Sequence, residues 1–159
     1  MKVNRFLFIL TLTTFCLSGC LNNEENSEST KLELPNVSDY SYLYVQGVDE
    51  NGVSSEATSK IVKDDKKIDE FISKVNKMEV IMPPNKELTQ KVKELRNPGN
   101  YIFVLSDNVA MDNKVYNMNF FKDGSIQFQH LDKNEIVYIS KEKHPKLLKE
   151  LKELLGIKY

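Results

Sequence analysis

Few side chains in this sequence of 159 residues belong to the types that perform covalent chemistry, and they include two cysteines and two histidines. Nucleophilic catalysis needs a nucleophile, a base and a group that orients the base. No G-x-S-x-G motif is present, and neither His130 nor His144 belongs to a triad-like or H-E-x-x-H pattern. We interpret His130 as a residue at the end of a strand and His144 as one just before a helix. We expect no catalytic residue.

Acidic loops are the next candidates, because carboxylate and amide oxygens are the ligands that calcium prefers. Residues 49–52 (DENG), and Asp107 with Asp112, lack the spaced acids and the closing Glu of a calcium loop. Turn formation explains them more simply, so we expect no metal and no cofactor. The 22 basic and 23 acidic side chains leave a formal charge of -1, which provides no basic field for binding nucleic acid. We therefore expect no nucleic-acid partner.

The first 20 residues, MKVNRFLFILTLTTFCLSGC, have the organisation of an export signal. Lys2 and Arg5 precede an apolar stretch of 12 residues, 6–17. A membrane-spanning helix needs about 20 predominantly apolar residues, so this stretch is too short to serve as one. We expect it to be cut off after export.

The cleavage point is marked by Leu17, Ser18, Gly19 and Cys20, which resemble the lipobox of bacterial lipoproteins. The resemblance implies that diacylglycerol is attached to the Cys20 thiol and that residues 1–19 are removed, Cys16 among them. We expect a protein held by this covalent lipid on the extracytoplasmic face of a bacterial cell membrane. The alternative is that Cys20 is an ordinary cysteine after a generic signal.

Composition divides the rest of the chain into a tether and a domain. Residues 20–37 are predicted to form the lipidated cysteine and a flexible tether, because they are rich in Asn, Glu and Ser and have no periodic apolar face. From residue 38 onward, apolar residues recur at strand and helix spacings. We predict one globular domain over 38–159.

In the first half of this domain, a strand at 40–45 is expected to pair with a weaker strand that ends at residue 62, across a turn at 51–52. A helix that begins after Asp64 or Asp65 is predicted by four apolar positions spaced i, i+3, i+4 and i+7: Ile68, Phe71, Ile72 and Val75. A second short helix is expected to open at 83–84 and to carry Leu88. Residues 101–105 are apolar on both faces, which favours a central strand.

The second half contains a hairpin whose register can be predicted. A three-residue loop at 122–124 pairs Phe120 with Ile126 and Met118 with Phe128, which gives one apolar face. The opposite face then carries four amides: Asn117, Asn119, Gln127 and Gln129. A strand at 136–140 and a leucine-rich helix after Pro145 follow. The predicted fold class is α+β, a single two-layer domain with a mainly antiparallel sheet, helices packed on one face and solvent on the other.

The four amides, Asn117, Asn119, Gln127 and Gln129, form the candidate binding face. Amides offer paired donors and acceptors, and neighbouring tyrosines offer stacking faces. These groups suit a cell-wall glycan or a strand of an envelope protein. The alternative is an ordinary solvated sheet face.

Between about residues 40 and 155, the chain has a tyrosine-rich first strand, the helical segment IVKDDKKIDEF at 61–71, the strand YIFVL at 101–105, and YIS at 138–140 before the closing helix. This order of elements resembles the YhfM-like domain of small lipoproteins from Gram-positive bacteria. The resemblance implies a lipid-anchored domain outside the cytoplasm and transfers no catalytic residue.

Together these features predict a lipid-anchored accessory or binding lipoprotein of the cell envelope that is not an enzyme. One alternative is a cell-wall or lipid-modifying enzyme whose site is dispersed along the sequence. Another is a structural or regulatory partner of a membrane complex.

Overall fold

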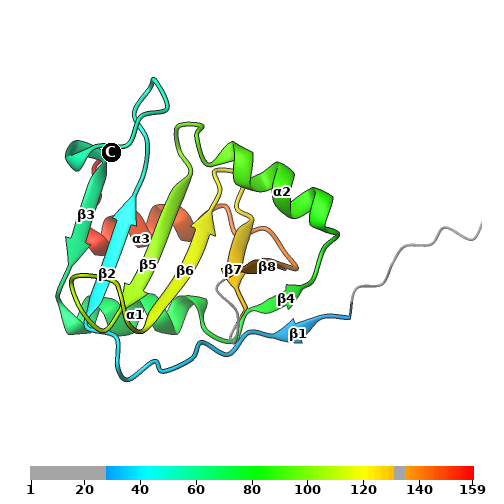
Figure 1. The fold of residues 1–159 in the computed structure, drawn as a ribbon, viewed down its shortest axis with the longest axis horizontal. Helices are drawn as coiled ribbons and strands as arrows, with labels where there is room; N and C mark the ends of the chain where they lie inside the picture. The colour runs from blue at the N-terminus through cyan, green and yellow to red at the C-terminus, as the bar shows by residue number, and fades with distance from the viewer. Residues whose placement is uncertain (1–27, 131–134) are drawn as a thin grey trace, which may run out of the picture.

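The computed structural model describes residues 28–130 and 135–159. Within these ranges the chain forms one sheet of eight strands in the order β1-β4-β8-β7-β6-β5-β2-β3, and every neighbouring pair is antiparallel. Figure 1 shows this sheet face on. The strands are β1 (Thr30–Lys31), β2 (Tyr42–Gln46), β3 (Ser59–Val62), β4 (Glu79–Ile81), β5 (Tyr101–Ser106), β6 (Val115–Phe120), β7 (Ile126–Gln129) and β8 (Ile136–Ser140).

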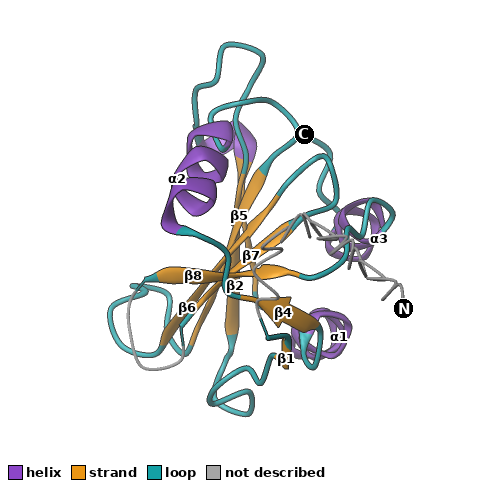
Figure 2. Ribbon diagram, turned by 90° about the vertical axis from the view of Figure 1, so that its right-hand side faces the viewer, coloured by secondary structure: helices purple, strands orange, loops and turns teal. Residues whose placement is uncertain are grey.

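Three α-helices pack against the sheet: α1 (Asp65–Val75), α2 (Asn85–Glu94) and α3 (Leu147–Leu155). A 3-10 turn, η1 (Glu56–Thr58), precedes β3. The predicted α+β class with a mainly antiparallel sheet is confirmed. The position of one helix differs from the prediction, because α1 and α3 cover one face while α2 lies on the other (Figure 2).

The main core lies between the sheet and the two helices α1 and α3. Helix α1 begins where predicted, since the Asp64 carboxylate accepts a hydrogen bond from the Lys67 amide at 3.3 Å. Its apolar face is buried, and Phe71 is fully excluded from solvent. The Phe71 ring stacks on Phe103 with centroids 5.3 Å apart and lies 6.2 Å from Phe120. The helical periodicity in the sequence therefore identified the centre of the core.

The β6–β7 hairpin has the predicted register. Met118 pairs with Phe128 and Phe120 pairs with Ile126. Gly124 adopts a φ of +89°, and a Cβ atom at this position would lie 2.5 Å from the Pro145 nitrogen. The amide of His144 donates to the Gly124 carbonyl at 2.7 Å, so the hairpin turn supports the chain just before α3. Only a glycine satisfies both the backbone conformation and this close approach.

The described part of the predicted tether belongs largely to the domain, which corrects the boundary of 20–37. Strand β1 pairs with β4, and the Leu32 amide donates to the Met78 carbonyl at 2.8 Å. Leu32 and Leu34 are 3% and 6% exposed and join the core. The tether was predicted from the polar composition of the segment, and that prediction overlooked Leu32 and Leu34. Their i, i+2 spacing places both side chains on one face of an extended chain. The predicted lipobox and Cys20 lie outside the described residues.

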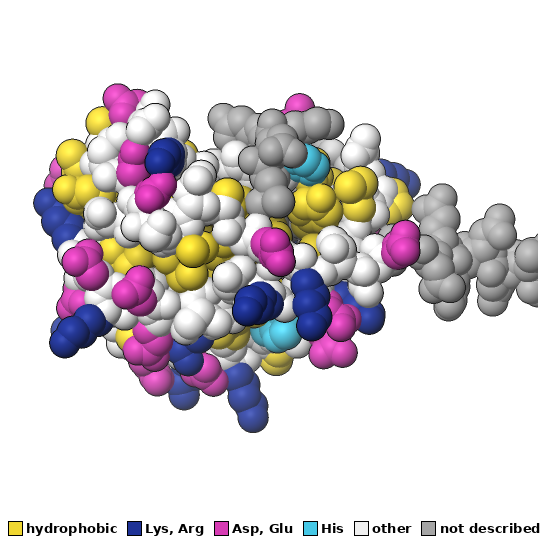
Figure 3. Space-filling view, turned by 90° about the horizontal axis from the view of Figure 1, so that it is seen from below, with side chains coloured by type: hydrophobic (Ala, Val, Ile, Leu, Met, Phe, Trp, Pro, Cys, Tyr) yellow, Lys and Arg dark blue, Asp and Glu magenta, His cyan; other side chains and the backbone are white. Residues whose placement is uncertain are grey.

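The charged surface is mixed. In Figure 3, which views the molecule from the side of α1 and β1, basic and acidic side chains lie interspersed. Lys74 of α1, for example, lies 4.0 Å from Glu70 and 3.6 Å from Glu150 of α3. Among the described residues, no helix is both long and apolar enough to cross a membrane.

Candidate functional site

The predicted amide row lies on one face of the sheet, but most of it is buried. Asn119, Gln127 and Gln129 are 5%, 0% and 7% exposed, so the expectation of a solvated row is wrong for these three. Asn119 Nδ2 donates to Gln127 Oε1 at 3.2 Å, and Gln127 Nε2 donates to the Leu88 carbonyl of α2 at 3.3 Å. Gln127 thus links the sheet to α2, and Asn119 supports the Gln127 side chain.

Asn117 is the member of the row that stays partly exposed, and its neighbour restrains it. Gln129 Oε1 accepts hydrogen bonds from the Asn117 amide nitrogen at 2.8 Å and from its Nδ2 atom at 3.0 Å. The pairing of β7 with β8 is irregular between Phe128 and Gln129, next to this contact between the Gln129 side chain and the Asn117 backbone.

The open part of the sheet lies over β3, β2, β5 and β6, beyond the reach of α2. Register places Tyr44 between Ile61 of β3 and Val104 of β5, and Val104 is in turn opposite Asn117 of β6. Ile61 is 41% exposed. We call this surface the tyrosine face and define it by its partly or fully exposed members: Tyr42, Tyr44, Ile61, Ile102 and Asn117. In Figure 1 these strands are seen from the side opposite α1 and α3.

A hollow of about 380 Å³ lies at the β3 end of the tyrosine face. Its lining combines hydroxyl, amide, charged and aliphatic side chains, namely Tyr44, Gln46, Ser54, Ser55, Glu56, Ser59, Lys60 and Ile61. The Tyr44 hydroxyl donates to Ser59 Oγ at 3.2 Å, and Ser59 Oγ donates to the Ser55 carbonyl at 2.7 Å. These bonds fix the Tyr44 ring in place. A fixed aromatic ring beside hydroxyl and amide groups suits a polar ligand that has one flat apolar surface.

The two histidines lie close to their predicted positions. His130 directly follows β7, and its ring stacks on Tyr138 with centroids 5.8 Å apart. His144 precedes α3 and lines a hollow of about 260 Å³ with Glu79 and Glu142. Lys141 donates to the Glu79 carboxylate at 2.7 Å, and this hydrogen bond lowers the pKa of Glu79. Within 28–130 and 135–159, no three His, Cys, Asp or Glu residues are grouped so that they could hold a metal ion.

The sequence did not reveal a charged cluster around Asp123, because its members come from three separate segments. Asp123 accepts hydrogen bonds from Ser125 Oγ at 2.6 Å and from Lys91 Nζ of α2 at 3.0 Å, and Lys143 Nζ lies 2.9 Å away. Lys91 also lies 4.8 Å from the Phe121 ring centroid. Burial acts to raise the pKa of Asp123, but hydrogen bonds from Ser125, Lys143 and Lys91 outweigh it and hold the pKa well below its usual value.

Asp123→Asn is expected to lower the free energy of unfolding at pH 7 by about 1 to 2 kcal/mol, a range reduced because the side chain is 35% exposed. A carboxyl whose pKa is lower in the folded state stabilises the fold above its unfolded pKa of about 3.9, and this contribution fades as the pH falls toward the folded value. The difference between wild type and variant should therefore shrink between pH 5 and pH 2. Urea unfolding at several pH values measures it. The exposed Asp112→Asn is the control, and a difference that is constant with pH would contradict the assignment.

The tyrosine face, the His144 hollow and the Asp123 cluster are thus three polar features that the fold assembles from the described residues. Comparison of the chain with protein-family models, with curated proteins and with solved structures found no match. The resemblance to the YhfM-like domain, which depends on the order and spacing of elements, stays a prediction. The geometry of the tyrosine face is consequently the basis for a functional hypothesis.

Proposed function

We propose that this chain is a lipid-anchored lipoprotein on the extracytoplasmic face of a bacterial cell membrane, and that it acts as a non-catalytic accessory or binding protein of the envelope. The lipobox-like residues 17–20 after a charged and apolar segment support the anchor. Nine residues separate Cys20 from Thr30, where β1 begins, and they span at most about 30 Å. The domain would therefore work close to the membrane surface.

The ligand that we propose for the tyrosine face is a cell-wall glycan. The observation that carries this assignment is the fixed Tyr44 ring beside a hollow whose lining includes serine hydroxyls and the Gln46 amide, on a part of the sheet that no described α-helix covers. The C–H face of a sugar packs on an aromatic ring, while its hydroxyls exchange hydrogen bonds with amides and hydroxyls. Tyr42 extends the aromatic surface along the same strand.

The anchor is tested by mass spectrometry of the membrane fraction from a bacterium that expresses the chain. We expect a mature amino-terminal peptide that begins at Cys20 and carries the mass of a diacylglycerol. Cys20→Ala should release the protein from the membrane or leave it unprocessed. An unmodified Cys20, or a Cys20→Ala protein that is processed and still anchored, would exclude the anchor.

The binding face is tested by co-sedimentation with purified peptidoglycan and by titration with soluble glycan oligomers. The double variant Tyr42→Ala/Tyr44→Ala is expected to bind at least about tenfold more weakly than wild type, which corresponds to about 1.4 kcal/mol. The control is Tyr138→Ala, which removes a half-buried tyrosine that stacks on His130 near the opposite end of the sheet. Circular dichroism verifies that each variant is folded. Equal binding by the folded double variant and wild type, or no binding by wild type, would exclude the glycan assignment.

A further inference from the structure

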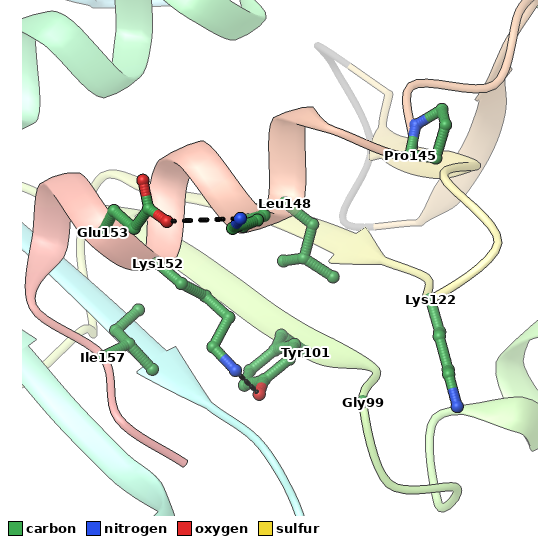
Figure 4. A pocket seen from close by; sticks show the side chains of 9 residues that line it. Gly99, Tyr101, Lys122, Pro145, Leu148, Lys152, Glu153 and Ile157 are labelled. Atoms are coloured by element: carbon green, nitrogen blue, oxygen red, sulfur yellow. Dashed lines mark hydrogen bonds and ion pairs between the residues drawn. The ribbon is translucent and has the colours of Figure 1, made fainter.

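A further concave surface lies on the opposite face of the sheet from the tyrosine face, beside α3. It is a groove of about 400 Å³ lined by Gly99, Tyr101, Lys122, Pro145, Leu148, Lys149, Lys152, Glu153 and Ile157. Figure 4 shows Leu148 and Lys152 extending from α3 toward Tyr101, with Lys122 on the far side of Gly99. A volume of this size is typical of small-molecule sites.

The floor of the groove is apolar and firmly held. Tyr101 and Ile157 are only 4% and 7% exposed, and Leu148 packs against the same core. The Tyr101 hydroxyl donates to the Tyr159 carbonyl and accepts a hydrogen bond from Lys152 Nζ at 2.6 Å. Because its hydroxyl is bonded on two sides and Lys152 Nζ lies 4.8 Å from its centroid, the Tyr101 ring is held in place at the floor of the groove.

The far wall is fixed by a contact between two turns. The Asn100 side chain accepts a hydrogen bond from the Lys122 amide at 2.7 Å and donates to the Glu94 carbonyl. Gly99 has a φ of +92°, and a Cβ atom there would approach the Lys122 side chain to 3.2 Å. The aliphatic part of Lys122 therefore lies along the Gly99 turn, and Figure 4 shows its ammonium group on the other side of Gly99 from that of Lys152.

The rim carries more positive than negative charge. Of the three lysines, Lys149 lies 3.8 Å from Glu153, and both of these side chains are mostly exposed, so the pair is weak. Lys122 and Lys152 have no carboxylate within ion-pair distance in the described chain. An ammonium group has three donors, and one donor of Lys152 is used by Tyr101. The lysines at this rim can therefore still receive an anion.

We propose that this groove binds a small amphiphilic anion, whose alkyl or flat apolar part lies on Tyr101, Leu148 and Ile157 and whose phosphate or carboxylate lies among the lysines of the rim. The apolar floor would bind the alkyl or flat apolar part of the ligand, and the excess positive charge would bind its anionic group. Neither feature alone would suffice, because an exposed lysine gains little from an anion in water. The inference is independent of the lipid anchor and of the tyrosine face.

The test uses residues 28–159, since the entire described sheet and core lie within them. Octyl phosphate, octyl glucoside and inorganic phosphate are each titrated, below any micelle concentration, into the isotopically labelled domain while amide NMR shifts are followed. We expect octyl phosphate to shift the amides of Gly99, Lys122 and α3 and to bind at least about tenfold more tightly than either other probe. Equal binding of octyl glucoside would exclude recognition of the anion. Equal binding of inorganic phosphate would exclude the apolar contact.

Variants separate a local site from general attraction by charge. Lys122→Gln/Lys149→Gln should weaken octyl phosphate binding by about tenfold. Lys86→Gln/Lys93→Gln, on the exposed surface of α2, changes the net charge equally and should leave binding unchanged. The same loss in both variants, or in neither, would overturn the proposal. Lys152 is left intact in these variants because its bond to Tyr101 supports the floor.

Discussion

Phe71→Ala is expected to lower the free energy of unfolding by about 3 to 5 kcal/mol, the largest effect of any single substitution considered for this fold. The side chain is fully buried, and its ring stacks on Phe103 at 5.3 Å while also contacting Phe120. Truncation removes buried apolar area and leaves a cavity between α1 and two central strands, which neighbouring rings fixed in their own contacts cannot fill. Because domains of this size are stable by about 5 to 15 kcal/mol, the variant would approach the limit of folding.

Urea unfolding followed by circular dichroism measures this effect. Val92→Ala on α2 is the matched control, because Val92 is also an apolar helical residue but is 44% exposed. We expect the control to change the free energy of unfolding by less than about 0.5 kcal/mol. A cost below about 1 kcal/mol for Phe71→Ala would show that α1 does not pack on the sheet as described.

Leu32→Ala is expected to lower the free energy of unfolding by about 2 to 5 kcal/mol. If Leu32 were part of a flexible tether, the substitution would not change the free energy of unfolding. The substitution therefore distinguishes a tether that extends to residue 37 from a segment that is packed on the domain. Leu32 is 3% exposed, and its backbone donates to Met78 and accepts from Lys77, both at 2.8 Å. Loss of the side chain removes apolar contacts from the core, and the two backbone bonds to the loop after α1 lose their support.

The control for Leu32→Ala is Val37→Ala, five residues later in the chain, where the valine is 37% exposed. We expect a change of less than about 0.5 kcal/mol from it. Proteolysis gives a second readout, because a docked segment around Leu32 should be protected from cleavage until the domain unfolds. Two results together would support the original prediction of a tether that extends to residue 37. These are a Leu32→Ala variant as stable as wild type and rapid cleavage at 30–34 in the native protein.

The spacing of apolar residues in the sequence was sufficient to predict those elements that bury one regular face. Helix α1 was predictable because Ile68, Phe71, Ile72 and Val75 recur at helical spacing, and all four are buried. The β6–β7 register was predictable because one loop length alone places apolar with apolar residues across the strands. Strands β1 and β4 were not predicted, since two or three residues are too few to show any period.

The candidate binding face of four amides could be predicted from the sequence only in part, because the sequence does not show which helix covers which face of the sheet. Alternation correctly placed Asn119 opposite Gln127 on one face, yet sequence could not show that α2 folds over that face. Helix α2 buries Leu88 and leaves Val92 exposed, so its apolar pattern gives a weak signal of where it packs. The Asp123 cluster and the groove beside α3 join residues from distant segments, and only the folded chain brings them together.

Strand β1 also determines how the domain responds to mechanical force. If the chain is held at Cys20, tension reaches Thr30 and Lys31 first, and these residues make the shortest pairing of the sheet edge, to Val80 and Glu79. The central pairs β5–β6 and β2–β5 are six and five residues long, and β2 would come under tension only after the segment before it, including the buried Leu32 and Leu34, had been released. Under increasing tension the segment 30–36 should peel away before the sheet yields, adding at most about 25 Å of chain. The edge strand would then act as an extensible link between the membrane and an intact binding domain.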